Sequence, residues 1–280
     1  MAGVMRMAAN EVDLTLNEEV AKAQEGDRDA LEHVIRSIQS KVYSLALRML
    51  WHPEDAKDAT QDILLRLVTH LSTFRADSAF FTWVYRIAAN HLLDCRRSRL
   101  ETQMISFDEF GKDLEEGLTE TPSTSAPLLY QEIRVGCTLG MLLCLDRPHR
   151  IAYILGDILE MNSTEAAAVV AVEPATFRKR LERARRSIVS FMKNRCGLAS
   201  SQNACRCSKR VKRAIDLKRV NPDQLLFAND QKNAREFPIV LTQIRELEEM
   251  QRAVVLYRTH PDYTVPDFLA TIRSLVSRSL

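Results

Sequence analysis

Apolar side chains recur at spacings of three and four residues along most of this chain, and this spacing places them on one face of an α-helix. One block contains Val42, Leu45, Ala46, Met49 and Leu50, and a second, after His52-Pro53, contains Ile63, Leu64, Leu67, Val68 and Leu71. Each such helix has to bury its apolar face against another. With only 8 Gly and 9 Pro in 280 residues, the chain also lacks the frequent turns of an all-β fold. The sequence therefore predicts an all-α protein.

The helical blocks divide the chain into two small helical domains, with a linker between them and an extension after them. We expect the first domain, the linker, the second domain and the extension to be residues 1–100, 101–131, 132–195 and 196–280. In the first domain, Gly26-Asp27 suits a turn, and Ser78 can cap the last helix. The linker loses the periodicity and gains Gly, Pro, Ser and Thr. The extension is expected to be helical as well.

Charge is unevenly distributed along the chain, although the net charge is only +2. Residues 101–135 contain 8 acidic and 2 basic residues, whereas residues 196–220 contain 7 basic and 1 acidic. A basic surface attracts polyanions such as nucleic acids. No apolar run approaches the roughly 18 residues of a membrane-spanning helix, and the first residues lack the apolar core of an export signal. We therefore expect a cytoplasmic protein.

Residues 162–186 have the pattern of a helix-turn-helix. A Ser or Thr within Asn162-Ser163-Thr164-Glu165 can cap a short first helix, Ala171-Val172-Glu173 can form the turn, and Pro174 suits the first position of a second helix. In this motif the second helix enters the major groove of DNA, where Arg pairs with guanine edges or phosphates. The candidate DNA-binding side chains on this helix are Thr176, Arg178, Lys179, Arg180 and Arg183. A solvated basic helix is the alternative, and the turn and the proline argue against it.

Aromatic residues cluster in the last helix of the first domain. The chain has 18 aromatic residues (10 Phe, 6 Tyr and 2 Trp), and four of them lie in residues 80–85. Aromatic rings can fill a core, or they can stack on unpaired bases. The same helix ends in Arg96, Arg97 and Arg99, which can hold phosphates. The order of rings and then basic residues suits a surface that binds single-stranded DNA, with core packing as the alternative.

Three stretches together make the chain resemble an extracytoplasmic-function sigma factor of bacterial RNA polymerase. They are Pro53–Arg66, Ser78–Asn90 and the helix-turn-helix. The resemblance covers about residues 18–100 and 132–195, in the family's order and with its usual acidic linker between. It implies a dissociable subunit without catalysis of its own, which binds the polymerase core and selects and melts promoters.

The resemblance also implies roles for particular residues. The helix that matches the polymerase-binding surface of the family carries Asp58, Gln61, Asp62, Leu65 and Arg66. An ordinary amphipathic helix is the alternative. The part that captures an unstacked minus-ten base corresponds to Phe81, Trp83, Asn90, Arg96 and Arg97. The second helix of the helix-turn-helix corresponds to the helix that recognises the minus-thirty-five element, and the acidic linker to one that threads the RNA path of the polymerase.

The extension contains three cysteines in a C-x8-C-x-C array, namely Cys196, Cys205 and Cys207. Thiolates favour soft metals such as zinc or copper(I), and the nearby Arg206, Lys209 and Arg210 are expected to lower the thiol pKa. A tetrahedral zinc site needs a fourth ligand, for which His260 is a distant candidate. Metal or redox sensing and structural thiols both remain open. Some family members carry cysteine-rich extensions that sense metals, which by analogy favours regulation in cis by this extension.

The remaining cysteines, Cys95, Cys137 and Cys144, lie within helical stripes and are expected to be small buried side chains. Apolar positions in residues 241–256 and 268–276 predict further helices. We expect these helices either to cover the chain's own polymerase-binding face or to pack on one another.

Two other function classes can be weighed against a sigma factor. A helix-turn-helix regulator that binds duplex DNA without the polymerase core is the first alternative, and the aromatic stretch and the Asp58–Arg66 helix argue against it. An enzyme is the least supported, because the sequence has no Gly-rich phosphate loop, paired-carboxylate cleft or Cys with an obvious partner His. The expected partners are core RNA polymerase, promoter DNA and an anti-sigma factor, and no cofactor is required.

Overall fold

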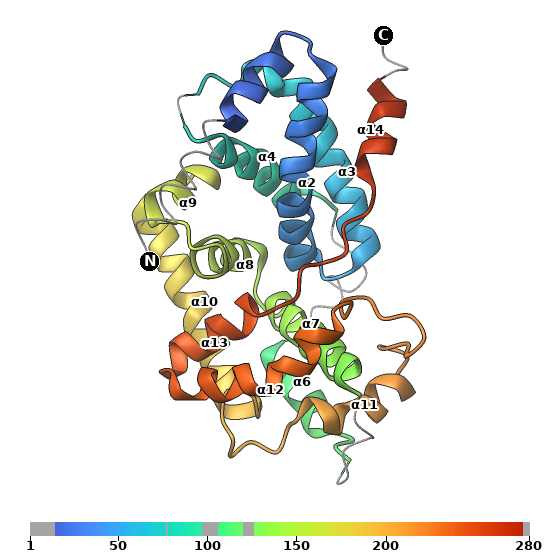
Figure 1. Ribbon diagram of the computed structural model, residues 1–280. Coiled ribbons are helices and arrows are strands. Elements are labelled where there is room, and N and C mark those ends of the chain that lie inside the picture. Colours follow the sequence, from blue (N-terminus) through green and yellow to red (C-terminus); the bar gives the residue numbers. More distant parts are fainter. Residues whose placement is uncertain (1–14, 77, 97–105, 120–125, 277–280) are drawn as a thin grey trace.

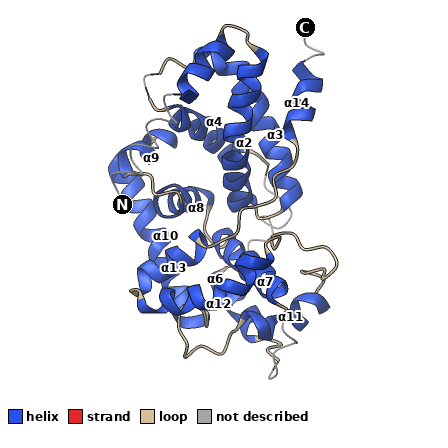
Figure 2. Cartoon of the chain, in the orientation of Figure 1, coloured by secondary structure: helices blue, strands red, loops and turns tan. Residues whose placement is uncertain are grey.

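The computed structural model describes residues 15–76, 78–96, 106–119 and 126–276, and these residues are mainly helical (Figure 1). Two isolated β-bridges, Cys196 with Cys205 and Asn221 with Gln224, are the only extended pairings in these ranges, and none of them contains a β-sheet (Figure 2). The predicted all-α fold is confirmed. None of the described helices combines the length and apolar character needed to span a membrane.

The amino-terminal helices follow the predicted blocks. They are residues 15–24, α2 (Arg28–Leu50), α3 (Pro53–His70) and α4 (Phe80–Asp94). Gly26 has a φ of 99°, which suits its place in the turn, and the Asp27 carboxylate caps α2. The predicted cap at Ser78 is wrong. The helix α4 starts one residue later than that cap requires, with Ala79 at the capping position and no side-chain acceptor.

The linker contains a helix that the sequence analysis did not predict. This helix, α6 (Phe107–Glu115), begins with a capping box in which Ser106 and Glu109 each accept a hydrogen bond from the other's backbone N–H. The rings of Phe107 and Phe110 lie 5.2 and 5.6 Å from the ring of Phe191. The acidic linker is therefore folded against the helices that follow it.

The next group of helices includes the helix-turn-helix. It consists of α7 (Pro127–Leu143), α8 (Arg147–Tyr153), a π-helical turn (Ile154–Ile158), α9 (Ser163–Val169) and α10 (Pro174–Arg195). α8 and α9 pack on α4. The two parts that are predicted to bind DNA therefore contact each other, and the predicted domain boundaries stay predictions.

Two buried guanidinium groups on α8 join these two groups of helices. Arg150 donates to the backbone carbonyl of Leu142 in α7 at 2.9 Å and to that of Met49 near the end of α2. Arg147 donates to the carbonyl of Leu93 in α4 at 3.0 Å. Hydrogen bonds from a charged donor are stronger than those between neutral groups. The start of α8 is thereby fixed to the carboxyl ends of α2, α4 and α7.

The extension packs along the rest of the chain. It contains α11 (Cys207–Asp216), α12 (Gln231–Glu246), α13 (Glu249–Arg258) and α14 (Phe268–Val276). α11 and α12 pack on α7, and α13 packs on α10. The chain then crosses to the amino-terminal helices, where α14 lies on α2 and α3 (red in Figure 1). There the ring of Phe268 lies 6.1 Å from that of Tyr43, and Arg273 forms an ion pair with Glu32.

The Arg150 contacts generate a stability prediction. Arg150→Met keeps a long apolar side chain but leaves several buried carbonyl oxygens without their charged donor. We expect the free energy of unfolding, measured by urea titration with circular dichroism, to fall by about 3 kcal/mol or more. The control is Arg28→Met, which changes an exposed arginine at the start of α2 and should shift that free energy by less than about 0.5 kcal/mol. Equal effects of the two changes would contradict the joining role of Arg150.

Candidate functional site

The helix-turn-helix has the predicted geometry. Asn162, rather than Ser163 or Thr164, caps α9. Its side-chain oxygen accepts hydrogen bonds from the backbone N–H groups of Thr164 and Glu165 at 3.1 and 3.0 Å. The turn follows α9, and Pro174 is the first residue of α10. The apolar face of α10 is buried, including Phe177 and Ile188. This packing fixes α10 with its basic face outward.

The outer face of α10 carries unpaired positive charge. Four of the five predicted DNA-binding side chains are exposed, and Arg180 is half-buried; the exposed ones are Thr176, Arg178, Lys179 and Arg183. Within the described part of the chain none of these five forms an ion pair. Arg185 is different, because its guanidinium makes a two-pronged contact with the buried Asp157 carboxylate at 2.5 to 3.0 Å. α10 thus has arginines engaged in the fold, such as Arg185, and a separate set available to a polyanion.

The aromatic rings of α4 form a cluster with Phe74. The ring of Phe80 lies 5.2 Å from that of Phe74 and stacks on that of Trp83 at 5.8 Å. Phe80 is buried, whereas Phe81 and Trp83 are half-exposed, and the ammonium of Lys41 lies 4.7 Å from the centre of the Phe81 ring. Core packing therefore accounts for Phe80, whereas Phe81 and Trp83 are partly exposed, as stacking on a base would require.

The other predicted residues of the first domain lie mostly at the surface. Asn90 and Arg96 are exposed, and Arg97 lies outside the described residues. The predicted polymerase-binding residues share one face of α3, where Asp58, Asp62 and Arg66 are exposed and Gln61 and Leu65 are half-buried. This arrangement leaves a charged surface with an apolar edge available on α3.

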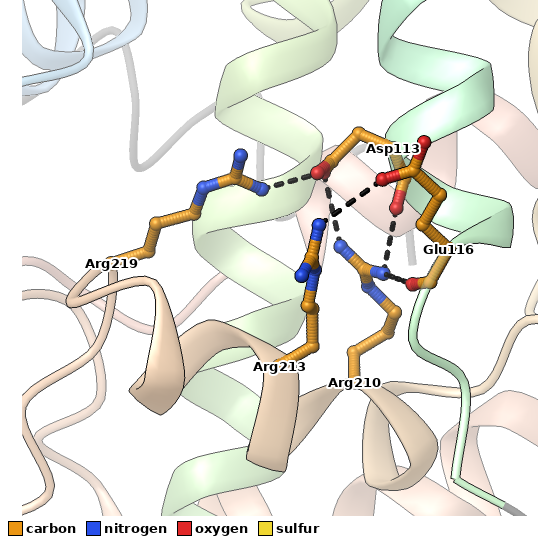
Figure 3. Close-up of polar contacts among 5 residues, drawn as sticks. All are labelled: Asp113, Glu116, Arg210, Arg213 and Arg219. Atoms are coloured by element: carbon orange, nitrogen blue, oxygen red, sulfur yellow. Dashed lines mark hydrogen bonds and ion pairs between the residues drawn. The ribbon is translucent and has the colours of Figure 1, made fainter.

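Arginines of the extension pair with acids of the linker, as Figure 3 shows. The buried Arg210 donates to the carboxylate of Asp113 at 3.0 Å and to the backbone carbonyls of Asp113 and Glu116 at 2.7 Å. Arg219 contacts the same carboxylate at 2.5 Å, and Arg213 contacts that of Glu116 at 3.1 Å. We call Arg210, Arg213 and Arg219 the arginine clamp.

The arginine clamp keeps its carboxylate partner ionised. Burial raises the pKa of Asp113, but the hydrogen bond from Arg219 and the charges of the three clamp arginines outweigh burial and lower it. A third linker acid, Glu115, is paired with Arg195 at the end of α10. Asp113, Glu115 and Glu116 are therefore engaged within the chain.

The three cysteines of the extension lie beside a fourth. Cys196, Cys205 and Cys207 line one cavity together with Cys137 of α7. Burial raises the pKa of all four thiols, and raises that of Cys205 to about 11. The predicted lowering by neighbouring basic residues is wrong. Loss of hydration outweighs their charge, and the guanidinium of Arg206 is directed to the backbone carbonyls of residues 201, 203 and 205.

The described residues do not present a preformed metal site. No three His, Cys, Asp or Glu side chains among them are arranged to hold a metal ion. Both ring nitrogens of His260 are engaged, one with the Thr138 hydroxyl and one with the Tyr263 hydroxyl, each at 2.8 Å. His260 therefore has no ring nitrogen left for a metal. Metal binding by the three cysteines of the extension stays a prediction.

Comparisons with known proteins identify the family. The Sigma-70 region 2 family model matches residues 34–101. The RNA polymerase sigma-H factor of Pseudomonas aeruginosa is 28% identical over 173 residues, which cover 60% of this chain and 89% of that protein. The ECF RNA polymerase sigma-E factor of Escherichia coli (strain K12) is 30% identical over 174 residues, which cover 60% of this chain and 90% of that protein. The chain belongs to the ECF family of RNA polymerase sigma factors.

This ECF sigma factor is a promoter-recognition subunit and not an enzyme. The region 2 match includes the candidate polymerase-binding residues on α3. It also includes the candidate minus-ten-binding residues on and after α4. Among solved structures, CnrH in complex with the cytosolic domain of CnrY matches with a TM-score of 0.45 and 20% identity, over 62% of this chain and 95% of that one. Family membership favours a sigma factor over a regulator that acts without polymerase.

Two features of the site were missed by reasoning from the sequence. Cys137 was assigned only to the core, although it shares a cavity with the cysteines of the extension. The contact between linker and extension was also not predicted. Its signal was present in the opposite charges of residues 101–135 and 196–220, which were interpreted separately.

The raised thiol pKa predicts slow alkylation. Iodoacetamide reacts with the thiolate, and a pKa of about 11 leaves little thiolate on Cys205 at pH 8. We expect Cys205 in the folded chain to react about a hundredfold more slowly than in the urea-unfolded chain at that pH, with the rate rising about tenfold per pH unit up to about pH 11. Peptide mass spectrometry measures the rate. A folded rate close to the unfolded one would show that the thiol is not held in this environment.

Proposed function

We propose that this sigma factor joins core RNA polymerase through the exposed face of α3 and recognises promoters with two separate surfaces. The polymerase-binding face comprises Asp58, Gln61, Asp62, Leu65 and Arg66. The minus-thirty-five element would be bound by Thr176, Arg178, Lys179, Arg180 and Arg183, and the melted minus-ten element by Phe81, Trp83, Asn90, Arg96 and Arg97. The exposed, unpaired basic face of α10 within a formed helix-turn-helix is the observation that carries this proposal.

The closed packing of the two DNA-binding parts has to open for this function. The guanidinium of Arg86 in α4 donates to the backbone carbonyl of Ala168 in α9 at 3.1 Å. Elements centred 10 and 35 base pairs upstream of a start site are roughly 85 Å apart on B-form DNA, at about 3.4 Å per base pair. A compact chain of this length has a radius of gyration of only about 19 Å. α4 and α10 can reach both elements together only after they separate.

We further propose that residues 196–280 regulate this opening in cis. The arginine clamp holds the linker acids Asp113 and Glu116, α13 packs on α10, and α14 packs on α2 and α3. A single segment thereby contacts both DNA-binding parts and the linker. While these contacts persist, the linker carboxylates are unavailable to polymerase, and the extension favours the closed chain.

Three further proposals concern a partner, the location and the signal. Solved structures show CnrH with the cytosolic domain of CnrY, and the sigma factor RpoE with the anti-sigma factor NepR from Bartonella quintana. For this chain we propose an anti-sigma factor as a partner and the cytoplasm, where RNA polymerase acts, as its location. A metal or redox response of Cys196, Cys205 and Cys207 is supported by their place in one cavity, and metal analysis of the purified chain tests it.

Charge reversal in the arginine clamp tests regulation by the extension. Arg213→Glu with Arg219→Glu places like charges beside Glu116 and Asp113, and both arginines are accessible enough to change without disturbing the core. If the closed chain loses about 1–2 kcal/mol of stability relative to the open chain, the ratio of closed to open molecules falls about five- to thirtyfold. We expect run-off transcription with core polymerase to rise by a factor in this range.

The matched control for the clamp variant is Lys218→Glu with Lys232→Glu. Both lysines are exposed residues of the extension, and the control makes the same change in net charge. Its transcription should stay at the level of the unmodified chain. Equal output from the clamp variant and the control would remove the support for regulation by the clamp.

Promoter recognition by α10 is tested separately. Arg178→Ala and Arg183→Ala each remove an exposed cation without touching the buried face of the helix. We expect each to weaken binding of the polymerase holoenzyme to its selected promoter duplex about tenfold or more at fixed salt. Promoters can be obtained by selection from random duplexes. Arg235→Ala, an exposed arginine of α12, should leave the affinity unchanged; a loss as large as that of Arg178→Ala would argue against DNA recognition by α10.

A further inference from the structure

A cavity of about 330 Å³ lies between α6, α7 and the extension. Its wall is formed by Trp51 after α2, Phe110 of α6, α7, and residues of the extension that include Leu198 and Phe227. Pockets that bind small molecules in proteins commonly range from about 300 to 1,000 Å³. The cavity is therefore large enough for a compact organic molecule.

Two glycines on α7 shape this cavity. A Cβ atom added to Gly136 would lie 3.4 Å from the ring of Phe227, and one added to Gly140 would lie 3.4 Å from the ring of Phe110. The indole N–H of Trp51 donates to the backbone carbonyl of Gly136 at 2.9 Å. Because both positions lack a side chain, three aromatic rings can approach one face of α7 and enclose an apolar space.

The other groups around the cavity add little free charge. The four thiols are protonated at neutral pH, because burial raises the pKa of each. The carboxylate of Glu132 accepts hydrogen bonds from the backbone N–H groups of residues 226, 227 and 228 at 2.8 to 2.9 Å. Asp113 is neutralised by the arginine clamp. A bound ion would find no unpaired carboxylate in this wall.

One polar donor in the wall is unsatisfied. Arg134 is only 2% exposed and lines the cavity. Its terminal nitrogens donate to Thr259, and its guanidinium stacks on Phe237 at 3.9 Å. Its Nε has no hydrogen-bond partner among the described residues. Leaving a buried donor unpaired costs about 1–3 kcal/mol, and because this Nε is covered by protein atoms it supplies no donor to the cavity.

We propose that this cavity binds a small, uncharged, largely apolar organic molecule. The wall is shared between α6, α7 and the extension, so the site loses one side when the extension detaches. A ligand that binds only the closed chain shifts the equilibrium toward it. The consequence for transcription rests on the proposed regulation by the extension, whereas ligand binding itself does not.

The probe for this site is 6-propionyl-2-dimethylaminonaphthalene, an uncharged ketone whose emission shifts to the blue in apolar surroundings. Titrated into the full chain and excited beyond the absorption of tryptophan, it should show saturable, blue-shifted binding at one site per chain. Ile133→Trp fills the cavity from α7 and should weaken binding at least tenfold. Ile239→Trp makes the same change at a position 68% exposed on α12 and should leave binding unchanged. Circular dichroism checks the folding of both variants.

A second measurement on the unmodified chain does not depend on a variant that folds. Saturating probe should slow the alkylation of Cys205 and Cys207 by iodoacetamide severalfold, and it should leave Cys95, which does not line the cavity, unaffected. Absence of saturable binding, equal binding by Ile133→Trp, or absence of protection would each overturn the proposal. Binding of zinc or copper(I) without binding of the probe would assign the site to a metal instead. These assays need no polymerase, so their failure is distinct from failure of the clamp variant in transcription.

Discussion

The ionic contact between the linker and the extension determines how the rest of the chain is arranged. Arg210 is buried, and its charge is tolerated because the carboxylate of Asp113 and two backbone carbonyls accept from it. A buried cation that loses its carboxylate costs about 3–5 kcal/mol, whereas the more exposed Arg213 and Arg219 contribute little each. Loss of the Asp113 carboxylate would therefore cost far more than loss of either outer arginine, because it would leave the charge of Arg210 buried without its partner.

The features that were predictable from the sequence are those with local causes. The helix-turn-helix follows from Asn162, Pro174 and the apolar spacing of α10, all within about 30 residues, and its first and second helices formed where expected. The linker helix α6 had an equally local signal in Ser106 and Glu109, but the Gly, Pro and Ser content of residues 101–127 concealed it. Composition averaged over a segment can hide a short helix that a capping motif specifies.

The thiols illustrate the opposite case, because their basic neighbours in the sequence predict a lowered thiol pKa, whereas the pKa is raised. Arg206 is adjacent in sequence to both Cys205 and Cys207, yet its guanidinium donates hydrogen bonds to backbone carbonyls. The guanidinium of Arg210 is paired with the carboxylate of Asp113. Burial then dominates and disfavours the thiolate. Neither effect can be derived from the C-x8-C-x-C spacing. The contacts of Arg206 are with residues 201, 203 and 205, whereas the pairing of Arg210 and the burial of the thiols depend on α6 and α7, which lie about 60 to 100 residues earlier in the chain.

The docking of α14 connects opposite ends of the chain, since Glu32 and Arg273 are 241 residues apart. Domains fold as they leave the ribosome, with the amino-terminal part first. The surface around Tyr43 on α2 and α3 is therefore complete well before Phe268 has been synthesised. Each newly made molecule passes through an interval in which the parts that we propose to bind the promoter exist without the segment that contacts both of them.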